Sequence, residues 1–160
     1  MTIGLGDRIP PVTLKLMGPE GIEDVDTDSL FKGKRVALFA VPGAFTPTCS
    51  AQHLPGFVDN ADALKAKGVD EIVCLSVNDA FVMGAWGKAH NTGDKVKMVA
   101  DGNAQLTQAL GFELDASGAG LGTRSRRYSM IVENGQVKVL NAEAAGAFEV
   151  SSAEHMLSQL

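Results

Sequence analysis

The sequence predicts one α/β domain over residues 1–160, in which a mixed central sheet carries helices on both faces. Two observations favour this fold class. Segments typical of buried strands alternate with segments typical of helices along most of the 160-residue chain, which is the pattern of parallel strands joined by helical crossovers. Later in the chain, two strand-like segments flank Asn134-Gly135, a dipeptide typical of tight hairpins. Such a hairpin adds antiparallel strands to the parallel ones.

The composition argues against several classes of protein. Hydrophobic residues make up 45% of the chain and charged residues 21%, as in ordinary soluble globular proteins, so the chain is not intrinsically disordered. The net charge of −5 argues against a nucleic-acid partner, because general nucleic-acid binders are normally basic. No apolar run approaches the roughly 20 residues needed to span a bilayer, so no membrane association is expected.

The cysteine content bears on the cellular compartment. Only two cysteines, Cys49 and Cys74, are present, and the first residues have the features of neither a secretory signal nor a transit peptide. This combination indicates a reducing compartment and thiol chemistry rather than a disulfide framework. We therefore expect a cytoplasmic protein.

The first part of the chain contains three expected strands. Residues 12–16 and 22–25 are predicted to be short strands on either side of a turn at 18–21. A single helical turn is expected at 28–33. Residues 35–41, RVALFAV, form a nearly continuous apolar run, which is typical of a central strand buried on both faces.

A helix is expected from Thr48 onward. Pro55-Gly56 should kink or interrupt it, and Gly68 is placed to end it. Further strands are expected at 71–77, 96–100, 128–132 and 137–140. Between them, we expect a helix that is capped by Asn78 or Asp79 and runs to His90, and a short helix that is capped by Asp101 or Asn103 and ends at Leu110-Gly111. The capping-box pair Ser151 and Glu154 should open a C-terminal helix. Together these elements predict the thioredoxin-like arrangement.

The junction between the strand at 35–41 and the following helix is the most informative segment. Sites in open α/β sheets lie beyond the carboxyl ends of strands, and Cys49 falls there, in the first turn of the helix. Unpaired first-turn amides and the positive helix end both favour a thiolate over a thiol. Thr46 is close enough in sequence to reach the sulfur or an oxygen beside it. Cys49 could instead be an inert, small apolar residue, but its position favours reactivity.

The segment Pro42–Cys49, PGAFTPTC, matches the peroxiredoxin signature Pro-x-x-x-Thr-x-x-Cys. The stretches VPGAFTPTCSAQHLPGF, LSVNDAFVMGAWG and RYSMIVENGQV resemble the type-five peroxiredoxins, also called type II in plants, and the resemblance runs from about Gly6 to Leu160. It implies an antioxidant thiol peroxidase on a thioredoxin-like fold that reduces hydrogen peroxide and alkyl hydroperoxides. It also implies a homodimer. The expected reaction needs no metal or organic cofactor.

The resemblance assigns roles to individual residues. Cys49 matches the peroxidatic cysteine, and Thr46 matches the threonine that hydrogen-bonds the sulfur and the peroxide. Pro42 matches the proline that shields the pocket. The expected mechanism is attack of the Cys49 thiolate on the nearer peroxide oxygen, which converts the sulfur to sulfenic acid.

An arginine is expected to complete the site. The residues alone do not choose among Arg124, Arg126 and Arg127, but the resemblance selects Arg127 and leaves the other two as surface charges, one of which could lie just behind the site. In the transition state, negative charge spreads over both peroxide oxygens. Arg127, the Thr46 hydroxyl and the amides near Thr48 and Cys49 are the expected donors to that charge.

His53 follows Cys49 by four residues, on the same face of a helix. As a general base it would make Cys49 the nucleophile of a hydrolase or transferase. As a metal ligand with Cys49 it would supply only two of the donors that zinc needs. We expect instead a polar residue in the wall of the substrate pocket, with Pro42 and Thr48.

Cys74 lies in the middle of a predicted strand, so core packing is expected rather than a resolving role. Some relatives have a resolving cysteine near the C-terminus, but residues 147–152, AFEVSS, contain none. An external thiol should therefore recycle Cys49, and we favour glutathione with glutaredoxin over thioredoxin.

Three further points remain open. A non-catalytic thioredoxin-like redox sensor or binding protein is the alternative function, which the joint presence of the signature residues and Arg127 disfavours. Residues 118–122, GAGLG, are expected to form a flexible loop beside the pocket rather than a dinucleotide-binding turn. Phe45, Phe81 and Trp86 lie at the same end of the predicted sheet as Cys49, where they form either a partner surface or ordinary core.

Overall fold

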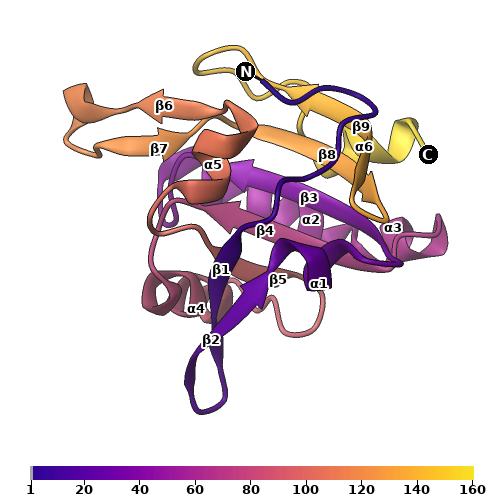
Figure 1. Ribbon diagram of the computed structural model, residues 1–160, viewed down its shortest axis with the longest axis horizontal. Coiled ribbons are helices and arrows are strands. Elements are labelled where there is room, and N and C mark those ends of the chain that lie inside the picture. The colour runs from indigo at the N-terminus through magenta and orange to yellow at the C-terminus, as the bar shows by residue number, and fades with distance from the viewer. Residues whose placement is uncertain (1) are drawn as a thin grey trace.

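Seven strands form the central sheet of the computed structural model, which describes residues 2–160 (Figure 1). They are β1 (Thr13–Gly18), β2 (Gly21–Asp26), β3 (Arg35–Val41), β4 (Glu71–Ser76), β5 (Lys97–Ala100), β8 (Tyr128–Glu133) and β9 (Gln136–Ala142). Their order across the sheet is β2-β1-β5-β4-β3-β8-β9. The central strands β3, β4 and β5 are parallel, and every other pair of neighbours is antiparallel. The predicted mixed sheet is confirmed.

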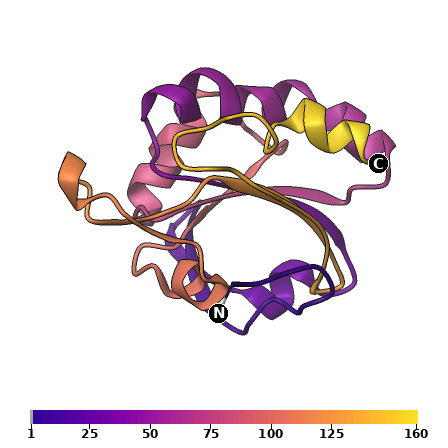
Figure 2. The same cartoon turned by 90° about the horizontal axis from the view of Figure 1, so that it is seen from above.

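Helices cover both faces of this sheet (Figure 2). They are α1 (Thr27–Phe31), α2 (Leu54–Asp59), α3 (Ala61–Ala66), α4 (Ala80–Ala89), α5 (Gln105–Leu110) and α6 (Ala153–Ser158). Buried residues of α2, α3, α4 and α6 share one hydrophobic cluster, and those of α1 and α5 share the other. This is the predicted thioredoxin-like arrangement.

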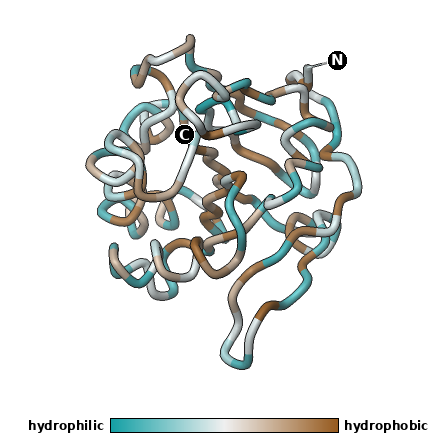
Figure 3. Tube along the Cα trace, turned by 90° about the vertical axis from the view of Figure 1, so that its left-hand side faces the viewer, coloured by the Kyte–Doolittle hydropathy of each residue, from teal (hydrophilic) through white to brown (hydrophobic). Residues whose placement is uncertain are grey.

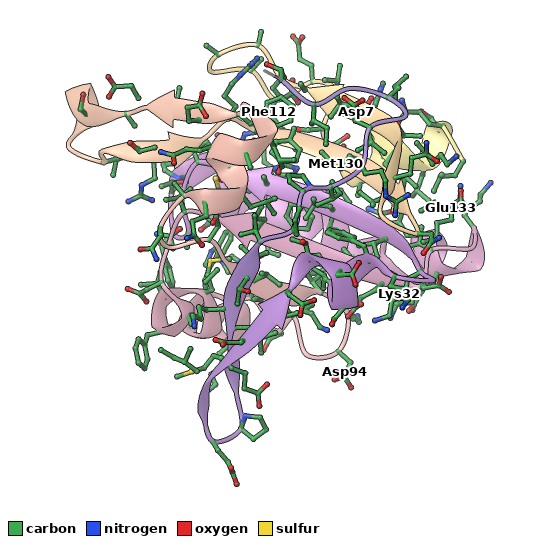
Figure 4. All side chains as sticks on the ribbon, in the orientation of Figure 1. Asp7, Lys32, Asp94, Phe112, Met130 and Glu133 are labelled. Carbon is green, nitrogen blue, oxygen red and sulfur yellow. The ribbon has the colours of Figure 1, made fainter. Side chains whose placement is uncertain are left out.

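Strand β3 contributes alternate side chains to the two clusters, as the two-residue period of a strand requires. Ala37, Phe39 and Val41 face the cluster of α2, α3, α4 and α6. The residues that face the opposite cluster are Val36, Leu38 and Ala40. Hydrophobic residues accordingly follow the central strands in Figure 3. Phe112 and Met130 belong to the cluster on the α1 and α5 face and are labelled in Figure 4.

The topology brings four chain segments to one edge of the sheet. The parallel strands β3, β4 and β5 all end there, at Val41, Ser76 and Ala100. Strand β8 runs the opposite way, and Tyr128 at its start pairs with Ala40. Arg127, one residue earlier, is therefore level with the end of β3.

The helix expected after Thr48 begins with a wider turn. Residues Cys49–His53 form a π-helix, in which the Leu54 amide donates to the Cys49 carbonyl, five residues back. Pro55 has no N–H, and its ring would collide with the Ala51 carbonyl in a regular α-helix. The wider turn removes that conflict, as π-turns often do where a helix is interrupted. The interruption therefore precedes Pro55, and α2 continues through it.

A short hairpin was not predicted. Strand β6 (Glu113–Asp115) pairs with β7 (Thr123–Ser125), and a 3₁₀ turn at Ser117–Ala119 joins them. Three-residue strands are too short to show a hydrophobic period. The glycine-rich segment expected as a flexible loop beside the pocket is thus the end of this hairpin, which projects from the body of the protein (Figure 1).

The predicted helix caps are partly confirmed. Ala104 occupies the cap position of α5 without a side-chain cap, but Asp101, rather than Asn103, accepts hydrogen bonds from the first-turn amides of Leu106 and Thr107. The C-terminal helix begins one residue later than its capping-box spacing predicts. Ser152, not Ser151, caps α6 and accepts from the His155 amide at 3.1 Å.

Candidate active site

Cys49 lies at the end of the loop that leaves β3, and its side chain is fully buried. The loop curls back at Phe45, whose φ of 64° is in the left-handed region that non-glycine residues rarely adopt. The Ala44 amide donates to the side-chain oxygen of Asn78 at 3.0 Å, which ties the loop to the end of β4. The Thr46 hydroxyl donates to the Gly43 carbonyl at 2.6 Å. These bonds fix the approach of the chain to Cys49.

Two backbone amides at the start of this helix are left without a carbonyl partner. The Ser50 amide donates to the Thr46 carbonyl at 2.9 Å and begins the hydrogen-bond ladder of the helix. Within residues 2–160, no backbone carbonyl accepts from the amides of Thr48 and Cys49. Amides in this position favour negative charge nearby.

Arg127 joins Cys49 to His53. Its Nη2 donates to the Cys49 sulfur at 3.1 Å, and its Nη1 donates to Nδ1 of His53 at 2.8 Å. The guanidinium carbon also lies 5.7 Å from the ring centre of Phe148, at the distance of a cation–π contact. A cation in contact with the sulfur stabilises the thiolate that acts as the nucleophile.

His53 is held as a neutral ring with one defined tautomer. Its Nε2 lies 2.9 Å from the Ser151 carbonyl, which can only accept, so Nε2 carries the hydrogen. Its Nδ1 is then free to accept from Arg127. Burial and the Arg127 charge lower the pKa of His53 to about 3, against the opposing effects of Ser151 and Glu143.

The contacts of His53 argue against its acting as a general base or as a metal ligand. Both ring nitrogens are occupied, so neither is available to take a proton from Cys49 or to bind a metal. Within residues 2–160 no group of three or more histidine, cysteine or acidic side chains is placed to hold a metal ion. His53 holds Arg127 through Nδ1, and its place in the wall of the substrate pocket stays a prediction.

The other expected site residues lie in the loop itself. Because the Thr46 hydrogen points to Gly43, the lone pairs of this hydroxyl remain to accept from a ligand. Thr48 is half-buried, and its side chain makes no capping hydrogen bond. Pro42 is half-buried, and its carbonyl accepts from Nη1 of Arg124 at 3.3 Å.

Of the three neighbouring arginines, Arg127 is the one that contacts the sulfur. Arg124 also donates to the Leu121 carbonyl at 3.0 Å and so links the β6–β7 hairpin to the loop at Pro42. Arg126 donates to the Glu143 carbonyl at 3.1 Å and lies over the ring of Phe112. Both residues are half-buried and hydrogen-bonded rather than plain surface charges, and Arg124, which contacts Pro42, is the one that lies just behind the site.

Cys74 is a buried core thiol of β4 and belongs to the same hydrophobic cluster as Cys49. Burial raises its pKa well above the ordinary value, and a charge on Cys49 adds to this effect while Arg127 opposes it. Cys74 is therefore a weak nucleophile in the folded protein.

Sequence reasoning missed three supporting contacts. Trp86 is fully buried, so it is not part of an exposed patch, and its Nε1 donates to the Ser50 hydroxyl at 3.0 Å. Phe148 packs against His53, with ring centres 5.0 Å apart. Ser151 supplies the carbonyl that fixes His53. Only the three-dimensional fold brings these residues to Cys49, so no local motif marks them.

Comparison with known proteins identifies the family. The Redoxin family model matches residues 5–157. Peroxiredoxin-2E-2 of rice, a chloroplastic protein, is 53% identical over 99% of this chain and 73% of its own length, and peroxiredoxin-2C of Arabidopsis thaliana is 50% identical over 99% and 98%. The chain belongs to the peroxiredoxins. These enzymes are thiol peroxidases, so membership favours the predicted enzyme over the non-catalytic alternative.

A solved structure agrees with this peroxiredoxin in fold. Reduced Prx3 of Vibrio vulnificus in complex with hydrogen peroxide is similar, with a TM-score of 0.95 and 54% identity over 99% of each chain. The thioredoxin-like fold class is confirmed over nearly the full length. Residues 2–160 of this peroxiredoxin contain no helix of the length and apolarity that a membrane crossing needs.

The buried neutral state of His53 predicts a loss of stability in acid. In the unfolded chain this histidine binds a proton near pH 6.5, and in the folded chain only near pH 3. Between these values the unfolded state holds more protons, so the free energy of unfolding falls as the pH falls, by up to about 1.4 kcal/mol per unit from this group. Denaturant titrations from about pH 7 to about pH 4 should show this slope in the wild type and a smaller one in His53→Gln.

The control for this experiment is His155→Gln, which removes a histidine outside the Arg127 contacts. It should keep the acid slope of the wild type. Parallel stability curves for the wild type and His53→Gln would contradict the prediction.

Proposed function

We propose that this peroxiredoxin reduces hydrogen peroxide and alkyl hydroperoxides through Cys49. The observation that carries the proposal is the guanidinium of Arg127, which contacts the Cys49 sulfur and is itself held by His53. The Cys49 thiolate attacks the nearer peroxide oxygen, forming an S–O bond as the O–O bond breaks. Hydroxide or alkoxide leaves and takes up a proton, and the sulfur becomes sulfenic acid.

The groups around the sulfur suit the charge that develops in this step. Negative charge moves from the sulfur onto the leaving oxygen. Arg127 and the free amides of Thr48 and Cys49 are donors beside that path, and donors fixed before the reaction need no reorganisation. The Thr46 hydroxyl, whose hydrogen is given to Gly43, accepts from the peroxide O–H and so orients the substrate. Pro42 covers the pocket.

We propose that an external thiol recycles Cys49. Turnover needs a second thiol to attack the sulfenic acid, and Cys74 is buried with a raised pKa. Because Cys49 is also fully buried, a small thiol reaches it with less rearrangement than a protein does. This supports glutathione, followed by glutaredoxin, over direct reduction by thioredoxin. A thiol-based cycle of this kind suits a reducing compartment such as the cytoplasm.

Loss of a donor to the transition state should slow the reaction with peroxide. We expect Arg127→Gln to lower the second-order rate constant by about 10²–10³, as for the deletion of an oxyanion donor. Thr46→Val should also slow it, because the substrate loses its acceptor. Stopped-flow measurement of peroxide consumption tests both. Arg126→Gln is the matched comparison, and an effect larger than that of Arg127→Gln would show that the wrong arginine has been assigned.

The two cysteines should behave differently. Cys49→Ser should abolish peroxidase activity, whereas Cys74→Ser should keep most of it. Excess peroxide without reductant should drive Cys49 to sulfinic acid, because no second thiol intercepts the sulfenic acid. Mass spectrometry of the treated protein decides this point. A Cys49–Cys74 disulfide as the main product would instead assign the resolving role to Cys74.

We further propose a homodimer formed near the active-site loops. Phe45 and Phe81 are 54% and 60% exposed, and they follow β3 and β4 at the same edge of the sheet. Large apolar side chains exposed at the same end of a sheet favour a partner surface there.

Light scattering tests the dimer. The wild type should have twice the mass of one chain at tens of micromolar, and Phe81→Asp should shift the mass toward that of a monomer. Leu5→Asp, which charges another exposed apolar residue, should leave the dimer intact. A monomeric wild type would disprove the proposal.

A further inference from the structure

One carboxylate oxygen accepts hydrogen bonds from three consecutive residues of the segment that precedes α6. Glu143 directly follows β9 and is only 3% exposed. Its Oε2 accepts from the amides of Glu149, Val150 and Ser151 at 2.8, 2.9 and 2.8 Å, and from the Ser151 hydroxyl at 2.7 Å. Burial opposes ionisation, but these hydrogen bonds hold the pKa of Glu143 below its ordinary value. We name Glu143 and residues 149–151 the glutamate clasp.

The clasp is one hydrogen bond away from the catalytic arrangement. While the amide and hydroxyl of Ser151 donate to Glu143, its carbonyl accepts from Nε2 of His53 at 2.9 Å. His53 in turn accepts from Arg127, which donates to Cys49. The backbone adds a second link, because the Glu143 amide donates to the Arg127 carbonyl at 3.0 Å.

We propose that Glu143 is a positioning residue for peroxide reduction, which acts by holding the Ser151 carbonyl against Nε2 of His53. This inference rests on the roles proposed above for Cys49 and Arg127. Glu143 touches neither the sulfur nor the substrate. Its effect passes through the tautomer of His53, since only a bare Nδ1 can accept from Arg127.

Loss of the clasp should change this tautomer. In Glu143→Gln the charged Oε2 is replaced by a neutral amide oxygen, which accepts these four hydrogen bonds more weakly, so the Ser151 carbonyl is less firmly fixed. The His53 proton can then move to Nδ1, where it faces an N–H of Arg127. Two donors cannot bond each other, so the guanidinium turns away from Cys49.

The first measurement is the rate of the peroxide reaction in Glu143→Gln. We expect a decrease of about tenfold, smaller than for loss of a direct donor and comparable to loss of an outer partner of a histidine ligand. Glu133→Gln is the matched control, because it removes the same charge from an exposed residue at the far end of β8 (Figure 4). It should react at the wild-type rate.

The second measurement separates positioning from a general loss of structure. Nitrogen-15 chemical shifts distinguish protonated from bare ring nitrogens, and His53→Leu identifies the His53 signals. The wild type should show Nε2–H, and Glu143→Gln should gain Nδ1–H. In the His53→Leu background, Glu143→Gln should slow the reaction little further, since the two changes act through one contact. An unchanged tautomer, or an equal slowing in both backgrounds, would overturn the proposal.

If Glu143→Gln does not fold, Ser151→Ala replaces it, because that change removes the shortest bond of the clasp and keeps the carboxylate. A smaller shift in the same direction supports the proposal, and no shift in tautomer or rate refutes it. Activity in Cys49→Ser would refute the proposed function instead, while the tautomer measurement still reports on the clasp.

Discussion

The rest of the site depends on one planar guanidinium that contacts two partners. Arg127 donates through one nitrogen to the Cys49 sulfur and through the other to His53. Its donors have a fixed geometry, so a shift in either partner is passed to the other. The antiparallel pairing of β8 with β3 brings Arg127 level with the carboxyl end of β3, since Tyr128 pairs with Ala40. The site is thus a product of sheet register as much as of local sequence.

The π-helix is the second feature that positions the site. It begins at Cys49 and ends at His53, the two residues that share Arg127. Pro55 explains why a wider turn is tolerated here, because a regular helix would place its ring against a carbonyl. Pro55 therefore also shapes the site through the wider turn, although it touches none of the reacting groups.

Sequence reasoning succeeded where structure depends on neighbours along the chain. The buried strand at 35–41 and the Asn134-Gly135 hairpin follow from local patterns, and both central residues of that turn have positive φ in the structure. It failed where contacts join distant segments. Ser151 has the spacing of a helix cap, but its hydroxyl is already used by Glu143, so the next serine caps the helix. The tautomer of His53 depends on a carbonyl 98 residues away, which no local pattern reveals.

The two outer strands of the sheet limit how copies of this chain can associate. Strand β2 exposes acidic side chains at Glu23, Asp24 and Asp26, and like charges on an edge oppose pairing with another strand. The start of β9 is covered by the N-terminal segment, because Gly6 and Asp7 form backbone hydrogen bonds with Val137. Growth of one continuous sheet across two molecules is therefore disfavoured. The dimer proposed above, which would form through loops, uses neither edge strand.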